Sequence, residues 1–334
     1  MKRFFAGLLV AVLLLAGCAL NNDDLRSRNF TALDTDISIY AEGEEAEAAL
    51  NAAKKEVLRL EGVYSPNSSD LTTLNSTGTA TVSDELAGLI TRGQSLSFET
   101  SGCFSLTVGP LVEAWGFESK DYRVPSREER TALMQKVDDS QINIQGNTIT
   151  IPEGWGVDVG GIAKGAISDS VMDVMRTYNI DSAAVSLGGN VQLSGPQADG
   201  SPWRIGIQDP EDTNALCANF EASEACAVIT SGGYERYFES DGIEYHHIID
   251  PRTGMPATGQ LTSVTIISPD GTLADALSTA LYVMDLEGAM RYWQENSQNF
   301  ECILVDRSNN IYVSEGIAAK VSAENGYNKE VIAL

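Results

Sequence analysis

The chain shows two kinds of hydrophobic pattern. Residues 35–40 place apolar and polar side chains alternately, which is typical of a half-buried β-strand. Residues 44–61 instead place apolar side chains three or four positions apart, the spacing with which one face of a helix meets a core. The same helical spacing recurs over residues 83–99, 163–178 and 273–284. The pattern therefore predicts an opening strand and helix, followed by further helices at irregular intervals.

Shorter apolar and β-branched runs predict the remaining strands. Residues 142–151 read as a hairpin, because Gly146 and Asn147 at its centre readily adopt the positive φ of a tight turn. Residues 64–81 are rich in Ser, Thr, Asn and Asp, which predicts a long functional loop. Strands that come in runs, without regular alternation with helices, indicate an α+β fold rather than a doubly wound sheet. Further strands are predicted over residues 183–187, 203–208, 227–230, 245–249 and 262–268.

The first residues carry the pattern of an export signal. Lys2 and Arg3 precede an apolar stretch over residues 4–15, which is too short to span a bilayer because about 20 apolar residues are needed. The segment closes in Leu-Ala-Gly-Cys at Cys18, which resembles the lipobox of bacterial lipoproteins. An ordinary cleaved signal with an incidental cysteine is the alternative. We expect a signal peptide over residues 1–17, a lipidated tether over 18–28 and a folded domain over 29–334, anchored at the extracytoplasmic face of the bacterial cell membrane.

The acidic composition of the chain argues against nucleic acid as a partner. The 334 residues include 47 acidic and 22 basic side chains, and the formal net charge of −25 repels nucleic-acid phosphates at long range. An anionic cofactor therefore needs local help from helix N-termini, a few basic side chains or a divalent cation. Four cysteines follow Cys18 without the paired spacing of a zinc site. Cys217 and Cys226 are either a local disulfide or free thiols, because an oxidising compartment permits a disulfide without demanding one.

A glycine-rich segment is the first candidate for binding chemistry. Residues 158–165 read DVGGIAKG between a predicted strand and a predicted helix, where adjacent glycines allow the backbone to approach a phosphate closely. The spacing is neither that of a P-loop nor that of a dinucleotide-binding fingerprint. A tight structural turn is the alternative interpretation.

Asp275 and Thr279 form the second candidate. They stand four residues apart in a predicted helix, which puts a carboxylate and a hydroxyl on the same face. Mg²⁺ prefers such oxygen donors and completes its shell with a carbonyl, water and substrate phosphate. The alternative is a capping box of Thr272 and Asp275, which would explain the carboxylate without a metal.

The two histidines of the chain are adjacent. His246 and His247 begin the sequence HHIIDPRTG, which contains a proline turn. An imidazole near a carboxylate such as Asp250 can orient a hydroxyl or accept its proton near neutral pH. Two hydrogen-bonded structural histidines are the alternative. Two more strand-to-glycine turns, over residues 186–190 and 230–234, present hydroxyl and amide groups that can line a cleft.

Taken together and in this order, these segments resemble the ApbE family of FAD:protein FMN transferases, which attach flavin to extracytoplasmic redox proteins. The resemblance covers roughly residues 28–318 and is most specific over residues 158–165, 186–189 and 230–280. It implies a single ApbE-type, T-fold-like catalytic domain of two packed lobes, with mixed or antiparallel sheets and flanking helices. It also implies that FAD is the substrate and Mg²⁺ the cofactor.

The resemblance assigns site residues as well. It implies that Mg²⁺ is held by the backbone carbonyl of Gly161 together with Asp275 and Thr279, so that Asp275 is also essential for catalysis. His247 is then the residue that deprotonates or orients the acceptor hydroxyl. Contacts to FAD are expected from Leu33, Tyr64, Cys103, Phe104, Ser105, Asp158, Lys164 and Ile249.

Two segments depart from the family pattern. A Met-Gly-Thr motif near the flavin is replaced at residues 33–35 by Leu-Asp-Thr, and a Phe-Asp pair is replaced at residues 104–105 by Phe-Ser. Both departures concern the isoalloxazine side of the pocket. Tyr64 is expected there on a loop that covers the flavin, where it would stack on the ring; an exposed loop tyrosine is the alternative.

The expected reaction is a Mg²⁺-dependent transfer of FMN from FAD to a protein. The acceptor is a threonine of an extracytoplasmic protein, the product is a phosphoester, and AMP is released. The family implies an acceptor that is a membrane redox-complex subunit with an FMN-binding domain. Three alternatives stay open at this point: an FAD pyrophosphatase that uses water as acceptor, a non-catalytic flavin-binding lipoprotein, and an anchored binding protein for an unrelated solute.

Overall fold

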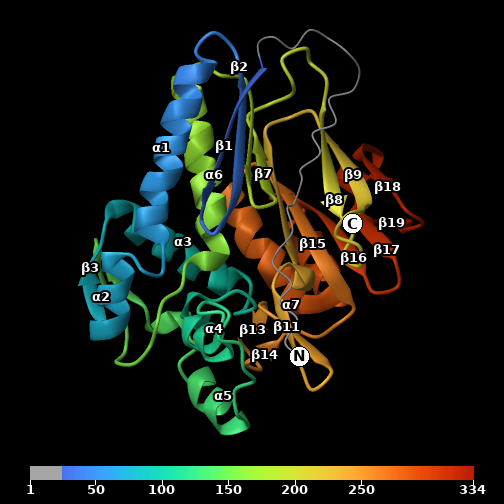
Figure 1. Ribbon diagram of the computed structural model, residues 1–334. Helices are drawn as coiled ribbons and strands as arrows, with labels where there is room; N and C mark the ends of the chain where they lie inside the picture. Colours follow the sequence, from blue (N-terminus) through green and yellow to red (C-terminus); the bar gives the residue numbers. More distant parts are fainter. Residues whose placement is uncertain (1–24) are drawn as a thin grey trace.

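The structure, a computed structural model, describes residues 25–334, so the predicted signal peptide and Cys18 lie outside the described residues. Its centre is a nine-stranded sheet, antiparallel except for one parallel pair at the C-terminal edge (Figure 1). In spatial order the strands are β1 (Leu25–Ala32), β2 (Thr35–Glu42), β6 (Ser182–Leu187), β7 (Asn190–Leu193), β10 (Cys226–Gly232), β15 (Leu261–Ser268), β16 (Glu301–Asp306), β17 (Asn310–Ser314) and β19 (Asn328–Ile332). Residues 25–28, expected in the tether, are therefore the first residues of β1.

Long helices cover one face of this sheet (Figure 1). They are α1 (Ala46–Tyr64), α3 (Asp84–Glu99), α6 (Gly160–Thr177) and α7 (Gly271–Asn296), and α6 packs between α1 and α7. The apolar positions at helical spacing are the buried ones, because they face the sheet and the neighbouring helices. The main core therefore lies between the helical layer and the sheet, with members such as Val57, Ile167, Leu277, Ile39, Ile229 and Ile266.

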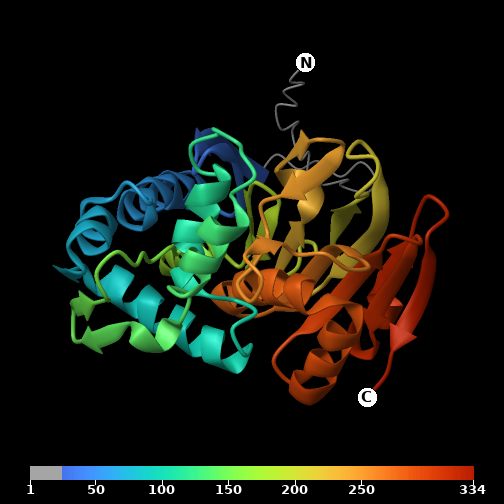
Figure 2. The ribbon, with the colours of Figure 1, turned by 90° about the horizontal axis from the view of Figure 1, so that it is seen from below.

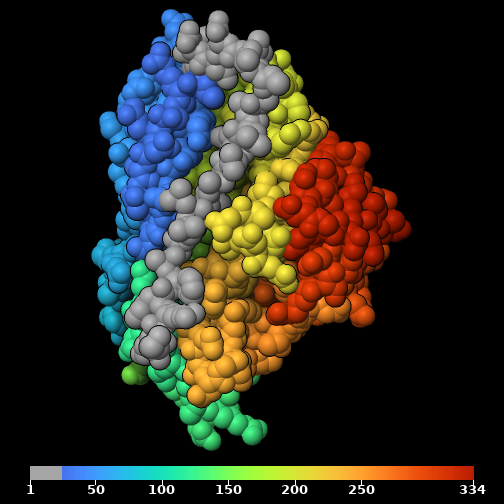
Figure 3. All heavy atoms as spheres, turned by 45° about the vertical axis from the view of Figure 1, so that its right-hand side comes forward, coloured from blue at the N-terminus to red at the C-terminus, as the bar shows by residue number. Residues whose placement is uncertain are grey.

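A small sheet covers the other face. Its strands are β8 (Trp203–Gln208), β9 (Leu216–Ala222) and β18 (Val321–Ala323), with β9 in the middle. Apolar side chains of this sheet and of the central sheet form a second core, which includes Trp203, Phe220, Val305 and Val313. The surface view shows the C-terminal strands packed beside the segment around β8 and β9 (Figure 3). The predicted α+β fold is confirmed.

One region predicted as a loop is ordered. Residues 69–77 form helix α2 (Ser69–Thr77), because Ser68 caps its first turn and Gly78 ends it with a φ of 77°. Strand β3 (Thr79–Thr81) follows and joins the predicted hairpin, whose strands are β4 (Asn143–Gln145) and β5 (Thr148–Thr150). The prediction of a long loop over residues 64–81 is therefore wrong: polar residues that favour turns here serve as helix caps.

A third apolar cluster joins short segments at one end of the molecule. It contains α4 (Gly109–Trp115), α5 (Arg127–Met134), the hairpin β11 (Tyr237–Ser240) and β12 (Ile243–His246), and the pair β13 (Ile249–Asp250) and β14 (Met255–Pro256). These segments lie side by side in both ribbon views (Figures 1 and 2). The predicted strand over residues 245–249 is split, so that His247 lies between β12 and β13. Single-turn 3₁₀ segments occur at Leu106–Val108, Asp139–Gln141 and Gly233–Glu235, and a longer one at Glu315–Lys320.

Helix α7 runs on past the predicted end at Met284. Asp285 interrupts it with a φ of 62°, and the helix then continues to Asn296. The Asp285 carboxylate accepts hydrogen bonds from the backbone N–H groups of Gln260 and Leu261, which holds the kink against β15. No helix among residues 25–334 is long and apolar enough to cross a membrane.

Candidate active site

The N-terminal ends of α6 and α7 meet at the glycine-rich segment. The backbone N–H of Gly165 donates a 2.8 Å hydrogen bond to Oδ2 of Asp275, and Nδ2 of Asn190 donates a 3.0 Å hydrogen bond to Oδ1. A Cβ atom on Gly165 would lie 2.8 Å from Cβ of Asp275 and closer still to the carbonyl oxygen of Gly271, so the approach requires glycine. The structure therefore brings together two candidate motifs that are 110 residues apart in the chain.

The Asp275 carboxylate is not part of a helix cap. The N-cap of α7 is Asp270, whose side chain accepts a hydrogen bond from the backbone N–H of Leu273. The hydroxyl of Thr272 donates instead to Asp169 of α6, at 2.9 Å. The capping-box interpretation of Thr272 and Asp275 is therefore wrong, because each of these side chains is bonded outside α7.

Burial and local donors act in opposite directions on Asp275. The residue is 5% exposed, and this desolvation raises the pKa of its carboxyl from the ordinary value. The Lys164 ammonium, the Gly165 N–H and the Asn190 amide each favour the ionised form and lower the pKa. A cation bound at the carboxylate would act in the same direction as Lys164.

Thr279 lies one helical turn from Asp275, as predicted. Its Oγ1 is 3.5 Å from Oγ of Ser231, which also shares a 2.8 Å hydrogen bond with Ser278. Ser231 belongs to the glycine turn over residues 230–234. The glycine turn over residues 186–190 also reaches this site, since its last residue, Asn190, bonds Asp275.

The third predicted metal ligand is the carbonyl of Gly161. In an ideal α-helix this carbonyl would accept the N–H of Gly165. A carbonyl oxygen has two lone pairs, so the Gly161 carbonyl can accept a helix hydrogen bond and still bind another partner. Residues 25–334 contain no group of three or more His, Cys, Asp and Glu side chains arranged to hold a metal. A carbonyl, a carboxylate and a hydroxyl form a donor set of oxygens only, which fits Mg²⁺ and not Zn²⁺.

Asp158 begins the glycine-rich segment. Its Oδ1 accepts a 2.7 Å hydrogen bond from the backbone N–H of Gly160, and desolvation raises the pKa of its carboxyl. Phe104 lies against the same turn, since a Cβ on Gly161 would come within 3.0 Å of its ring. The predicted contacts Asp158 and Phe104 are therefore both next to the predicted metal site.

His246 is a structural residue. The carbonyl oxygen of Ala257 accepts a 2.9 Å hydrogen bond, so Nε2 of His246 must donate it, and Nδ1 accepts a 3.3 Å hydrogen bond from the N–H of Ile248. Burial lowers the pKa of this imidazole. Both ring nitrogens are thus occupied, and the ring is packed edge-on against Tyr282.

His247 has a different environment. Its Nδ1 lies 3.2 Å from the carbonyl oxygen of Arg236, which can only accept, so Nδ1 carries the proton. Within residues 25–334 no hydrogen-bond partner occupies Nε2, which keeps its lone pair. Desolvation and the positive charge of Arg236 lower the pKa of His247 well below the ordinary 6.5. The half-buried imidazole is therefore neutral at physiological pH, and the lone pair of its Nε2 is free to accept a proton.

Asp250 shapes the turn that follows His247. Its carboxylate accepts hydrogen bonds from the backbone N–H and the guanidinium of Arg252, and the guanidinium also donates to the carbonyl of Val283 on α7. Ile249 is buried in the third cluster, whereas Cys103 is buried in the main core. These two predicted flavin contacts lie near the turn, since charges of Asp250 and Arg252 act on the Cys103 thiol.

The departures from the family pattern have local explanations. Residues 33–34 are the two central positions of the β1–β2 hairpin turn, with φ values of 55° and 54°, and the Leu33 N–H donates to Glu61 at 2.6 Å. Ser105 is buried and donates a 2.7 Å hydrogen bond to Asp139, which also accepts from the backbone N–H of Leu106. The Ser105 hydroxyl is therefore already engaged by a buried carboxylate.

Tyr64 is the last residue of α1 and is 8% exposed. Its side chain belongs to the main core, and burial raises the pKa of its phenol to about 12. Tyr64 is therefore neither exposed nor part of a loop. Cys217 and Cys226, whose pairing the sequence left open, are free thiols.

Two charged residues of the site were missed in the sequence. Glu235 and Arg236 follow the second glycine turn, and Arg236 fixes His247 through its carbonyl. Desolvation raises the pKa of Glu235, while the charges of Lys164 and Arg236 lower it. Lys164 and Arg236 form no salt bridge with any residue of the described chain, so two cations are available to an anionic ligand. The sequence signal that could have identified Glu235 and Arg236 is a pair of charged residues immediately after the glycine turn over residues 230–234.

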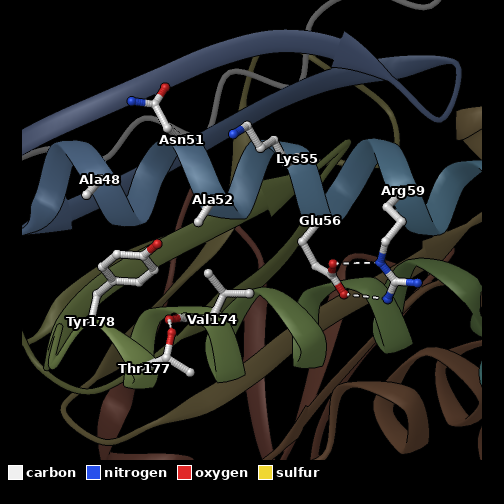
Figure 4. A pocket seen from close by; sticks show the side chains of 9 residues that line it. All are labelled: Ala48, Asn51, Ala52, Lys55, Glu56, Arg59, Val174, Thr177 and Tyr178. Atoms are coloured by element: carbon white, nitrogen blue, oxygen red, sulfur yellow. Dashed lines mark hydrogen bonds and ion pairs between the residues drawn. The ribbon is translucent and has the colours of Figure 1, made fainter.

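A separate groove of about 500 Å³ runs between α1 and α6 (Figure 4). Lys55 and Tyr178 line it, and Glu56 and Arg59 form an ion pair at one end. None of the predicted site residues lines it. The groove is therefore not the candidate active site.

The chain is similar to known proteins over most of its length. The model of the ApbE family matches residues 33–304. A Treponema pallidum FAD:protein FMN transferase is 32% identical over 310 residues, which is 85% of each chain, and one from Vibrio cholerae is 38% identical over 220 residues, which is 64% of this chain and 65% of the relative.

Solved structures show the same fold. The ApbE protein of Thermotoga maritima superposes with a TM-score of 0.82 at 31% identity, covering 89% of this chain and 99% of that one. The flavin transferase ApbE of Vibrio cholerae superposes with a TM-score of 0.79 at 28% identity and the same coverage. The chain belongs to the ApbE family.

Proposed function

We propose that this chain is a FAD:protein FMN transferase that attaches FMN to a threonine of an acceptor protein. The threonine Oγ forms a bond to the FMN phosphorus, the bond from that phosphorus to the bridging pyrophosphate oxygen breaks, and AMP leaves. The threonine proton passes to a base. The observation that carries the proposal is the hydrogen bond that joins the glycine-rich segment to Asp275, one helical turn before Thr279, in an ApbE-family chain. The charge of Lys164 acts on both Asp275 and His247, which supports placing the imidazole near the same site.

The residues present fit a magnesium ion. The Gly161 carbonyl, the Asp275 carboxylate and the Thr279 hydroxyl would hold it, and Asp275 is already oriented by two donors. When bound, Mg²⁺ supplies charge neutralisation for the pyrophosphate and the leaving phosphate. Lys164 and Arg236 add positive charge close by, which an acidic protein needs in order to bind an anionic substrate.

His247 is the proposed base. A base must be neutral before it accepts a proton, and the lowered pKa keeps this imidazole neutral at physiological pH. The Arg236 carbonyl holds the proton on Nδ1, so Nε2 is the nitrogen that accepts. His246 cannot take this role, because both of its nitrogens are already hydrogen-bonded.

We also propose a lipid anchor at Cys18, which places the enzyme at the extracytoplasmic face of the bacterial cell membrane. The support is the lipobox-like sequence that precedes Cys18. The acceptor is then an extracytoplasmic domain of a membrane redox-complex subunit. Labelling with a radioactive fatty acid tests the anchor, and a Cys18→Ala variant that keeps the label contradicts it.

A labelling experiment tests the reaction. The protein is incubated with FAD, Mg²⁺ and a candidate FMN-binding-domain acceptor, and covalent flavin is detected by fluorescence after denaturing electrophoresis. Transfer predicts fluorescent acceptor and one AMP per flavin attached. Free FMN with unlabelled acceptor instead indicates a pyrophosphatase, and tight FAD binding without AMP indicates a non-catalytic flavin-binding protein.

His247→Gln is the informative variant in this assay. Loss of a general base predicts a fall in the transfer rate of about 10²–10⁴-fold, while FAD binding persists. His246→Gln is the matched control, and its predicted effect is on stability. Equal transfer rates for wild type and His247→Gln would contradict the assignment of the base.

A further inference from the structure

Both oxygens of the Asp275 carboxylate are held in place. Oδ2 accepts the Gly165 backbone N–H at 2.8 Å, and Oδ1 accepts the Asn190 amide at 3.0 Å. The two donors belong to different elements, one to α6 and one to β7. Asn190 is 2% exposed, so neither water nor another rotamer competes easily for the contact. The carboxylate plane is therefore fixed before any cation binds.

The backbone sets the position of Asn190. It is the first residue of β7 and pairs with Leu187 across the β6–β7 turn, whose glycines Gly188 and Gly189 have φ values of 60° and 98°. The orientation of the amide is also determined, because an ionised carboxylate only accepts and the NH₂ group must face it. Asn190 is not one of the predicted metal ligands. Because it donates a hydrogen bond to Asp275, it acts on the site through Asp275.

We propose that Asn190 is a positioning residue that makes the site prefer Mg²⁺ to Ca²⁺, an inference that rests on the proposed magnesium site. Mg²⁺ demands near-ideal octahedral geometry with ligands at about 2.0–2.1 Å, whereas Ca²⁺ accepts irregular shells at about 2.3–2.6 Å, including bidentate carboxylates. A carboxylate that cannot rotate therefore suits Mg²⁺, whereas a carboxylate that is free to rotate also accommodates Ca²⁺.

Asn190→Leu removes the amide while keeping a side chain of similar size. Oδ1 of Asp275 then loses its donor, and the carboxylate is held by the Gly165 N–H alone. Removing a partner that orients a metal ligand typically lowers the affinity for the metal by about 10–100-fold, and we expect such a loss of affinity for Mg²⁺. Because Ca²⁺ tolerates the rotated carboxylate, its affinity falls less, and the Mg²⁺:Ca²⁺ preference falls by about tenfold.

Binding of Mn²⁺ provides the readout. The full chain is titrated with Mn²⁺ in the presence of FAD and without acceptor, and bound Mn²⁺ is followed by electron paramagnetic resonance against an FAD-only blank. Displacement by Mg²⁺ and by Ca²⁺ gives the ratio of the two affinities. Asn190→Ser, whose side chain is too short to reach Asp275, is measured alongside in case the leucine variant does not fold.

Gln192→Leu is the matched control. Gln192 is another buried amide on β7, 3% exposed, and it bonds Ser168 and Asp169 rather than Asp275. The Gln192→Leu variant should lose about as much thermal stability as the Asn190 variants and keep the wild-type ratio of Mg²⁺ to Ca²⁺ affinity. A shift in the ratio confined to the Asn190 variants supports the proposal.

Two results would overturn it, and they are distinguishable. If wild-type protein binds no Mn²⁺ beyond the blank, the proposed magnesium site fails and the role of Asn190 fails with it. If wild type binds Mn²⁺ but the Asn190 variants keep the wild-type ratio, or Gln192→Leu shifts it equally, the magnesium site stands and only the role of Asn190 is wrong.

Discussion

The backbone N–H of Gly165 and the carboxylate of Asp275 are joined by a 2.8 Å hydrogen bond near the N-terminal ends of α6 and α7. Asp169 of α6 returns the contact by accepting the backbone N–H groups of Gly271 and Thr272, each at 2.9 Å. Each helix thus supplies a carboxylate to backbone N–H groups of the other. This reciprocal pairing fixes the glycine-rich turn relative to the proposed metal ligands on α7.

Gly165→Ala should damage both stability and the site. The new Cβ would meet Cβ of Asp275 at 2.8 Å and the Gly271 carbonyl oxygen, which is backbone and cannot move aside cheaply. We expect a loss of about 1–3 kcal/mol in the free energy of unfolding, measured by urea denaturation. Gly88→Ala is the control: Gly88 lies in α3 with open space around it, so alanine should stabilise by about 0.5–1 kcal/mol. A harmless Gly165→Ala would show that the helices do not need this close contact.

Asp275→Asn should remove metal-dependent transfer. The amide keeps the shape of the side chain but offers no negative charge, and metal stabilisation of several kcal/mol corresponds to a rate loss of at least about 100-fold. AMP release and covalent flavin, measured as functions of Mg²⁺ concentration, report the effect. Asp173→Asn is the control, because Asp173 is exposed on α6 and pairs only with Arg176. Turnover at the wild-type rate in Asp275→Asn would refute its role as a metal ligand.

The two histidines should be opposite tautomers. The contacts put the proton on Nδ1 of His247 and on Nε2 of His246. Because the chain has only two histidines, long-range ¹H–¹⁵N correlation spectra should show two imidazoles with distinct patterns. Both should stay neutral as the pH falls through 6.5, the ordinary value, because each folded-state pKa is lowered. The unfolded state binds protons in that window, so stability should fall as the pH drops below 6.5. A His247 pKa at or above 6.5 would contradict the structure.

Ser105→Ala tests whether this departure from the family pattern serves structure or flavin binding. The Ser105 hydroxyl donates to the buried Asp139, whose carboxylate would lose one partner. The expected cost is about 1–3 kcal/mol of unfolding free energy, with flavin affinity within about twofold of wild type. Thermal unfolding and FAD fluorescence quenching measure the two quantities. A large loss of FAD affinity with unchanged stability would instead place the hydroxyl on the flavin.

Several elements follow from the chain alone. Helices α1, α3, α6 and the first part of α7 were predicted because their apolar side chains recur at helical spacing, which reflects a local requirement to bury one face. The strand at β2 was predicted from its alternation of apolar and polar side chains, and the hairpin of β4 and β5 from the turn residues Gly146 and Asn147. The edge strands β1 and β19 were not, since their side chains are largely exposed and carry little apolar signal.

Residue patterns by themselves predicted the site as separate motifs, and the resemblance to the ApbE family joined those motifs into one site. Local spacing offered no reason to prefer the metal-ligand interpretation of Asp275 to a capping box. That preference came from the resemblance, which also assigned Gly161, Thr279 and His247. For Tyr64 the local pattern misled: its neighbours suggested a loop, whereas Tyr64 is the last residue of α1 and lies in the main core.

What the sequence determined by itself is the periodic burial that makes α+β layers and the set of chemical groups available to the site. What only the tertiary structure decided is which groups meet. The physical reason to prefer His247 to His246 lies in the groups that face each ring nitrogen. The fixed orientation of Asp275 depends on donors 85 and 110 residues away. Such contacts arise when helices and sheet pack together, and no local pattern of residues encodes them.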